Sequence, residues 1–185
     1  MAHPQFTDYE NNTRHAFQAM MWALSYPGRS FPLLTDERDD FAHIADSLLD
    51  LETSFYCEDE VLIPSLLHTG ARQLPSDRAA YHFYPSLDDS QLDSLQTASI
   101  GTLTYPDQAA TLFIGCTHGQ GIKLNLEGPG IPASEYEAIQ IEGLSFAFWE
   151  IRENAIRYPR GWDIFLVDRG AIIGLPRTTR ILIEE

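Results

Sequence analysis

Apolar residues recur at helical spacing in several stretches of this chain, and residues that begin or end helices bound each stretch. The first stretch opens on a capping-box pattern at residues 7–10 and ends at Pro27 and Gly28, where the helix cannot continue. Three of the apolar faces consist of Ala16, Phe17, Met20, Met21 and Leu24; of Phe41, Ile44, Ala45, Leu48 and Leu49; and of Phe146, Trp149 and Ile156. The predicted helices lie within 7–25, 40–49, 59–70, 86–95 and 145–156.

Short polar residues mark where the middle helices begin. Asp39 or Asp40 can cap the second helix, Asp59 the third and Ser86 the fourth, because their side chains can accept from the first free backbone N–H groups. Residues 29–39, between the first two helices, are polar and predict a loop.

The last part of the chain predicts a β-hairpin. Residues 163–168 and 171–175 are apolar runs joined by the turn Asp168-Arg169-Gly170. The first strand has no polar alternation, which predicts burial on both faces. Pro176 has no backbone N–H, so it marks an edge strand or the exit from the sheet.

A second hairpin is predicted from the runs 110–116 and 122–126, joined by the loop 117–121 with its two glycines. Further strands are predicted at 53–57, 79–84 and 136–141. Helices and strands interleave in the first half, and strands dominate the second. This order predicts an α/β fold, in which a mixed β-sheet is flanked by helices. Because no repeat or linker interrupts the pattern, residues 1–185 are predicted to form a single domain.

The charge of the chain limits its partners. The 185 residues include 27 acidic and 12 basic side chains, which gives a net charge of −15. Such a chain repels nucleic-acid backbones and anionic membranes, so we expect neither as a partner. The apolar runs are too short to span a membrane, and no secretory signal is visible. Two cysteines far apart, Cys57 and Cys116, favour a reducing cytoplasm.

A basic island stands out against this background. Residues 157–180 contain five arginines and two aspartates, a net charge of +3, which leaves −18 for the rest. Pairing of the hairpin strands brings both ends of the island together. The candidate residues are Arg157, Arg160, Arg177, Thr178, Thr179 and Arg180.

Two interpretations of this cluster are open. The planar fork of arginine fits phosphate and phosphonate oxygens, and the threonines can add donors. Alternatively the arginines pair with nearby carboxylates, such as Asp163, Glu150 and Glu153, or with a carboxylate on another subunit. Structural ion pairs are common, so we favour the second interpretation.

No catalytic set is recognisable, and the catalytic residue stays unknown. The one lysine, Lys123, could hold pyridoxal phosphate, but its position within a strand favours a solvent-facing side chain. His118 lies in the glycine loop, where a solvated histidine is expected. The six histidines show no metal-ligand spacing, and no serine lies in a G-x-S-x-G motif. We therefore expect neither a cofactor nor a metal.

Five short blocks resemble the PhnH family, the H subunit of the bacterial carbon–phosphorus lyase system, and occur in that family's order. They are HAFQAMMWALSYPGR (15–29), PDQAATLFIG (106–115), LEGPGI (126–131), YPRGWDIFLVD (158–168) and LPRTTR (175–180). Two features depart from the family pattern: Leu24 stands where methionine is usual, and the loop THGQG (117–121) is not a family signature.

The resemblance implies a fold like the large domain of pyridoxal-phosphate-dependent transferases without the cofactor. It also implies a homodimer that assembles with the G, I and J subunits, and the aromatic residues of the chain favour interfaces. The complex makes ribose 1-alkylphosphonate 5-triphosphate from ATP and a phosphonate. The chain would then be a non-catalytic or co-catalytic subunit, with ATP or a phosphonate as candidate ligands near a shared interface.

Two other functions stay open. One is a free-standing enzyme or binding protein for a phosphorylated metabolite that uses the arginine cluster, and the other is a pyridoxal-phosphate enzyme that uses Lys123.

Overall fold

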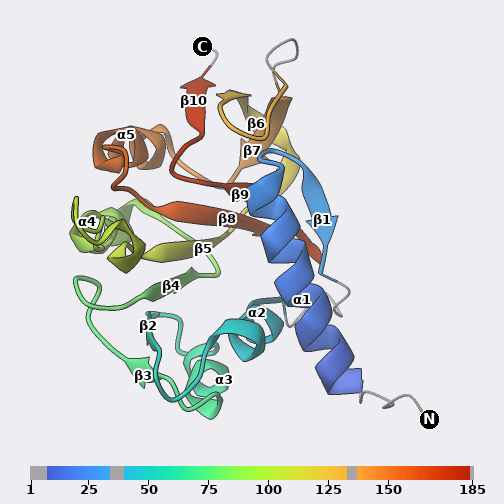
Figure 1. Cartoon of the computed structure of the whole chain (residues 1–185), viewed down its shortest axis with the longest axis vertical. Helices are drawn as coiled ribbons and strands as arrows, with labels where there is room; N and C mark the ends of the chain where they lie inside the picture. The colour runs from blue at the N-terminus through green and yellow to red at the C-terminus, as the bar shows by residue number, and fades with distance from the viewer. Residues whose placement is uncertain (1–7, 34–39, 133–136, 184–185) are drawn as a thin grey trace.

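The computed structural model describes residues 8–33, 40–132 and 137–183 (Figure 1). The α-helices are α1 Asp8–Ser25, α2 Asp40–Leu48, α3 Ile63–His68, α4 Leu92–Thr97 and α5 Phe146–Ala155, and two short 3-10 helices are η1 Asp89–Gln91 and η2 Pro106–Gln108. The strands are β1 Ser30–Pro32, β2 Ser54–Tyr56, β3 Arg72–Gln73, β4 Tyr81–Tyr84, β5 Thr111–Gly115, β6 Thr117–Glu127, β7 Glu137–Glu142, β8 Asp163–Asp168, β9 Ala171–Leu175 and β10 Arg180–Ile183.

The strands form two sheets. The larger has seven strands in the order β1-β9-β8-β5-β4-β2-β3. Strands β2, β3, β4, β5 and β8 pair in parallel, whereas β9 pairs antiparallel with both of its neighbours, β8 and β1, so the sheet is mixed. The smaller sheet is antiparallel in the order β10-β6-β7. This agrees with the predicted α/β class and adds a second sheet.

Apolar side chains fill both faces of the large sheet. One core contains side chains of α1, α2 and α3 against Phe83, Phe113 and Phe165. The other contains α4, α5 and the small sheet against Leu112 and Ile114. Because successive strand residues point to opposite faces, β5 contributes to both cores. Helix α5 and the small sheet therefore lie on the same side of the large sheet (Figure 1). The part of the chain that runs from α5 to β10 contains the predicted arginine cluster.

The predicted closing hairpin is confirmed. β8 and β9 pair antiparallel from Ile164↔Leu175 to Asp168↔Ala171. The turn needs positive φ at both Arg169 (41°) and Gly170 (78°), the conformation typical of a tight hairpin turn. Four consecutive residues of β8 are buried, as expected for a strand covered on both faces. The chain leaves the sheet at Pro176, and β9 is not an edge, since β1 pairs with its other side.

The predicted second hairpin is wrong. β5 lies inside the large sheet between β8 and β4, whereas β6 is the central strand of the small sheet. Residues 117–121 are not a loop but the start of β6, with a bulge between His118 and Ile122. Two apolar runs joined by a loop with two glycines fit a hairpin locally. The strands that pair with β5 are instead β4 and β8, neither of which adjoins it in the sequence.

Three smaller expectations also change. Residues 29–39 are not loop throughout, because Ser30–Pro32 forms β1, where an edge position tolerates the proline. Ser86 is not a cap: the Asp88 side chain accepts from Ser90 N, and Gln91 completes a capping box. Strands β3 and β10 were not predicted. The proposed opening of the first helix at Thr7 lies outside the described residues.

Within residues 8–33, 40–132 and 137–183, no helix has the length and apolar character that crossing a bilayer requires. Cys57 is buried, Cys116 is partly buried, and neither forms a disulfide.

Candidate functional site

The arginine cluster lies where the two ends of the β8–β9 hairpin meet. Ile164 pairs with Leu175, so Asp163 at the start of β8 lies beside the segment that follows β9. The sequence predicted this juxtaposition. A groove of about 400 Å³ runs along the segment, and its wall includes Arg177, Thr178, Thr179 and Arg180.

Arg177 is tied to three separate parts of the chain. Its Nε lies 3.2 Å from both carboxylate oxygens of Asp163, and its Nη2 lies 2.6 Å from Asp163 Oδ2. Its Nη1 donates to the carbonyls of Pro106 at 2.5 Å and Pro159 at 3.5 Å. The Arg177 backbone N–H also donates to Asp163 Oδ1 at 2.9 Å. Each guanidinium nitrogen thus has a protein acceptor, which favours the structural interpretation of this residue.

The sequence blocks quoted above come together around Arg177. Its partners Pro106, Pro159 and Asp163 belong to the blocks 106–115 and 158–168. A fourth block reaches the next residue, because a Cβ at Gly128 would lie only 2.8 Å from the Thr178 carbonyl oxygen. The glycine is therefore needed for this close approach. Residues from four separate sequence blocks therefore contact one another around Arg177 and Thr178.

Arg152 is the site residue that sequence reasoning missed. It lies on α5 with only 1% of its surface exposed, and its Nη2 donates to the carbonyls of Thr179 at 3.0 Å and Pro176 at 3.4 Å. Burial lowers the pKa of Arg152 to about 10, so the guanidinium stays charged at neutral pH. Its position four residues after Phe148, on the apolar face of the helix, is the signal that could have identified it.

The remaining arginines are arranged differently. Arg157 and Arg160 form a tight turn in which each backbone N–H donates to the other's carbonyl at 3.0 Å. The Arg157 Nη1 donates to carbonyls of Glu153 and Ile156. Neither arginine is part of the groove wall described above.

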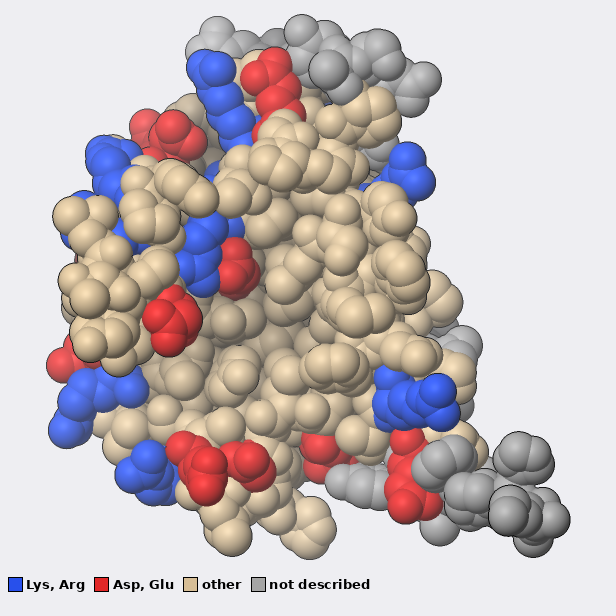
Figure 2. Space-filling model, in the orientation of Figure 1, with Lys and Arg blue, Asp and Glu red and all other residues tan. Residues whose placement is uncertain are grey.

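Arg180 is an exposed member of the cluster that lines the groove, with 69% of its side chain exposed and a loose contact to Glu127 at 3.9 Å. Thr179 is 2% exposed, and its Oγ1 has no hydrogen-bond partner. Figure 2 shows basic and acidic side chains interspersed over this face, rather than a broad field of one sign. Surface ion pairs of this kind contribute little to stability.

The histidines that the structure describes form no metal cluster. His118 is half-buried, and its backbone N–H donates to Asp168 Oδ2 at 2.8 Å. Burial lowers the pKa of the His118 imidazole, so the expected solvated loop histidine is wrong. His82 is fully buried, and burial lowers its pKa to about 4. In the described part of the chain, no three His, Cys, Asp or Glu residues lie close enough together to hold a metal ion.

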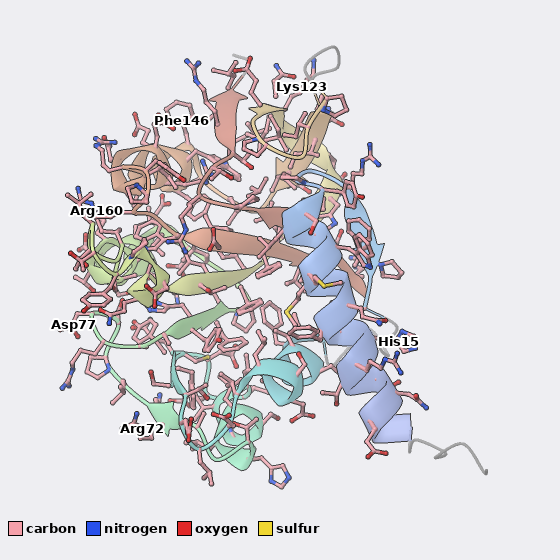
Figure 3. All side chains as sticks on the ribbon, viewed as in Figure 1. His15, Arg72, Asp77, Lys123, Phe146 and Arg160 are labelled. Carbon is pink, nitrogen blue, oxygen red and sulfur yellow. The ribbon has the colours of Figure 1, made fainter. Side chains whose placement is uncertain are left out.

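Lys123 lies in β6 opposite Gln140 of β7, with an exposed side chain. Figure 3 places it on the small sheet, far from Arg160. Its neighbour Leu124 is fully buried, as the strand alternation predicted.

We expect purified protein to show no visible absorbance from bound pyridoxal phosphate. A lysine that holds this cofactor needs a desolvated pocket, whereas Lys123 is exposed on a strand. Absorbance spectra of the wild type and Lys123→Ala should be identical. A visible band that disappears in the variant would show that the prediction is wrong.

Comparison with known proteins gives a consistent result. The family model described as "Bacterial phosphonate metabolism protein (PhnH)" matches residues 4–182. The chain is 30% identical over 169 residues to the "Putative C-P lyase subunit protein HtxG" of Stutzerimonas stutzeri, covering 90% of this chain and 84% of that protein. It is 31% identical over 117 residues to the "Alpha-D-ribose 1-methylphosphonate 5-triphosphate synthase subunit PhnH" of Rhizobium meliloti (strain 1021), covering 62% of this chain and 56% of that protein.

Proposed function

The chain belongs to the PhnH family, and from this membership we propose that it is a subunit of the carbon–phosphorus lyase system in phosphonate catabolism. The observation that supports the proposal most strongly is the match over residues 4–182, which includes all five sequence blocks. In this role the chain supports the synthesis of ribose 1-alkylphosphonate 5-triphosphate, in which a phosphonate displaces adenine from ATP.

We propose a non-catalytic or co-catalytic role for this subunit. The geometry of the arginine cluster supports this role, because all three guanidinium nitrogens of Arg177 are committed to the chain's own carboxylate and carbonyl oxygens. An arginine that binds a phosphoryl group needs donors that are free to reach it. The cluster therefore acts first as a structural element, and ATP chemistry is supplied by the assembled complex.

Several finer expectations belong to the same proposal. The chain forms one domain over residues 1–185, has a fold like the large domain of pyridoxal-phosphate-dependent transferases, and functions in the cytoplasm without that cofactor. A mixed sheet with helices on both faces is compatible with such a fold. The G, I and J subunits are the proposed partners, with ATP or a phosphonate bound near a shared interface.

A homodimer is also part of the proposal, and the outer face of α1 supports it. Three large apolar side chains of this helix, Phe17, Met21 and Trp22, and that of Tyr26 directly after it, are between 39% and 52% exposed. Trp22 and Tyr26 stack with ring centroids 5.7 Å apart. Exposed apolar side chains gathered on one face are typical of protein–protein interfaces.

We expect the isolated protein to be a dimer that Trp22→Glu converts to a monomer. A charge in the middle of the apolar face of α1 loses its solvation on association, which weakens the dimer. Light scattering over a wide concentration range measures the change. The matched control is Val61→Glu, because Val61 is 87% exposed elsewhere on the molecule and should leave the dimer intact. A wild type that is monomeric at all concentrations would contradict the prediction.

Growth tests the function in cells. A bacterial strain that lacks its own H subunit should grow on methylphosphonate as the sole phosphorus source when it expresses this chain. A strain that expresses an unrelated protein of similar size should not grow. Absence of growth with this chain, in a strain that a known H subunit rescues, would argue against the proposal.

A further inference from the structure

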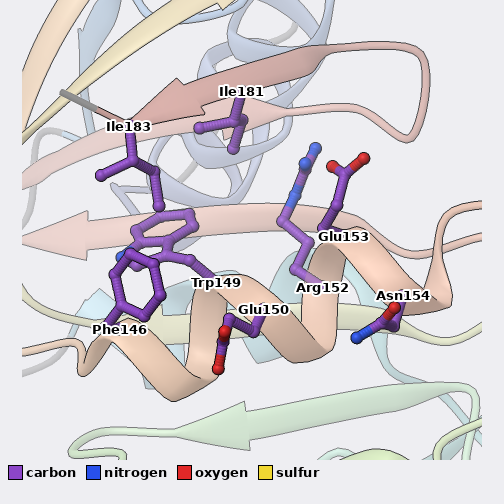
Figure 4. A pocket seen from close by; sticks show the side chains of 8 residues that line it. All are labelled: Phe146, Trp149, Glu150, Arg152, Glu153, Asn154, Ile181 and Ile183. Carbon is purple, nitrogen blue, oxygen red and sulfur yellow. The ribbon is translucent and has the colours of Figure 1, made fainter. Parts of the chain in front are cut away.

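A cavity of about 330 Å³ lies between helix α5 and strand β10 (Figure 4). Its walls include Phe146, Trp149 and Arg152 from the helix and Ile181 and Ile183 from the strand. It is separate from the groove along 177–180, although Glu153 contributes to both. A volume of this size fits a small molecule and is at the lower end for ligand pockets.

Two of the residues that line this cavity have a buried donor without an acceptor. Trp149 is 3% exposed and Arg152 is 1% exposed, yet Trp149 Nε1 and Arg152 Nε make no hydrogen bond. The two residues are three positions apart on α5, so they lie on the same face of the helix. More than about 90% of buried polar groups in proteins have a partner, so two unpaired donors on one helical turn require an explanation. Because both groups are donors, the missing group must be an acceptor.

The positive charge of Arg152 points to an anion. Among the described residues, no carboxylate lies within 4 Å of its guanidinium. A buried cation without a contacting carboxylate is costly: Glu153 and Asp163 act on Arg152 only from beyond salt-bridge distance, and its Nη2 bonds to carbonyls supply only dipoles. In Figure 4 the Arg152 side chain rises from α5 toward β10 with Glu153 beside it, whereas Glu150 points away from β10.

The other walls of the cavity are apolar. In Figure 4, Ile181 and Ile183 project from β10 toward the helix, and the Trp149 ring lies beneath Ile183 with Phe146 next to it. Phe146 is 53% exposed, so it has the freedom to move aside and admit a ligand to the two buried nitrogens. A ligand with an anionic head group and a short alkyl chain would match both parts of the cavity. The head group would accept from the buried donors, and the alkyl chain would contact the apolar side chains.

We propose that this cavity binds a small alkylphosphonate, with the phosphonate oxygens accepting from Arg152 Nε and Trp149 Nε1 and the alkyl group against Phe146, Ile181 and Ile183. The identity of the anion rests on the proposed function. The subunit then presents the phosphonate to the complex instead of binding ATP, which is too large for this cavity.

The two donor groups allow a direct test, because both N–H groups give signals in ¹H–¹⁵N NMR spectra. Titration of the labelled protein with methylphosphonate should shift the Trp149 indole and Arg152 Nε–H signals in a saturable way. Trp22 on α1, and Trp162, whose Nε1 donates to Ala98 O at 3.3 Å, are internal controls whose indole signals should not move. Trp149→Phe assigns the signal and should weaken binding.

Ligand and protein variants sharpen the test. Ethylphosphonate should bind about fourfold more tightly than methylphosphonate, because it buries one more CH2 group. Inorganic phosphate should bind more weakly than methylphosphonate, because it carries a hydroxyl where the apolar wall contacts the methyl group. Glu153→Gln should tighten binding by removing a negative charge that repels the bound anion, and this exposed position leaves folding intact. Arg152→Gln should abolish binding where the variant folds.

Absence of a saturable Trp149 shift would overturn the proposal, as would equal shifts at all three indoles. Acetate binding as tightly as methylphosphonate would also overturn it, since the cavity would then suit a carboxylate from a partner subunit. A negative titration together with growth on methylphosphonate would reject this site and leave the proposed function standing.

Discussion

Arg177→Ala is expected to destabilise the protein by about 3 kcal/mol, the lower end of the cost of breaking a buried ion pair. The Arg177 and Asp163 side chains are 16% and 22% exposed, so removal of the arginine leaves a mostly buried carboxylate without its partner. The variant also loses the bonds to Pro106 and Pro159. The melting temperature should fall by roughly 6–12 °C in a chain of this length.

Two further variants separate charge from geometry. Arg177→Lys keeps the positive charge but cannot hold Asp163 and both carbonyls at once, so it should recover only part of the lost stability. Arg180→Ala removes an exposed arginine from the same segment and should change the free energy of unfolding by less than about 1 kcal/mol. An Arg177→Ala variant with unchanged melting temperature, yet weaker binding of ATP or a phosphonate, would show that Arg177 is a ligand-binding residue instead.

Phe113→Ala should cost about 3–5 kcal/mol, the usual range for a buried phenylalanine. Phe113 is paired in register with Phe83 on β4 and Phe165 on β8. The three rings stack with centroids 5.0 Å apart at both steps. Loss of the middle ring removes both aromatic contacts and leaves a cavity at the centre of the parallel sheet.

Chemical denaturation measures this effect, with Phe146→Ala as the control. Phe146 is 53% exposed, so its removal should cost less than about 1 kcal/mol. Near-equal costs for the two variants would contradict the placement of β5 at the centre of the sheet. The comparison therefore tests the register of the three strands, which no local sequence signal defines.

The closing hairpin could be predicted because the residues that specify it are adjacent in the sequence. Two apolar runs flank a turn that needs positive φ at Arg169 and Gly170, and the sequence offers a glycine there. The proximity of Asp163 and Arg177 follows from that pairing alone. The structural interpretation of Arg177 was favoured from the sequence, and the bonds to Pro106 and Pro159 show how far its contacts extend.

The second sheet could not be predicted, because its strands pair with segments that lie far apart in the sequence. β6 follows β5 after a single residue, yet the two strands belong to different sheets. The pairing of β6 with β10 depends on residues far away in sequence, and β10 itself has only four residues. Without that strand the cavity against α5 has no second wall, so the cavity could not be inferred from the sequence.

Arg152 illustrates the same limit at the level of one side chain. In the sequence it is one basic residue among acidic neighbours, which normally indicates a solvated helix position. In the structure it is almost fully buried and holds the segment that contains Thr179. The arginines of this region thus differ in burial: Arg180 is exposed at the surface, whereas Arg177 is mostly buried and Arg152 is almost fully buried.

The most direct test of the proposed function is phosphonate-dependent release of adenine from ATP by the purified subunits. A mixture of the G, I and J subunits with this chain should release adenine when methylphosphonate is added. Release should fall to background when this chain is omitted, and the isolated chain should release none. Equal rates with and without the chain, or adenine release by the chain alone, would contradict its assignment as a supporting subunit of the synthase.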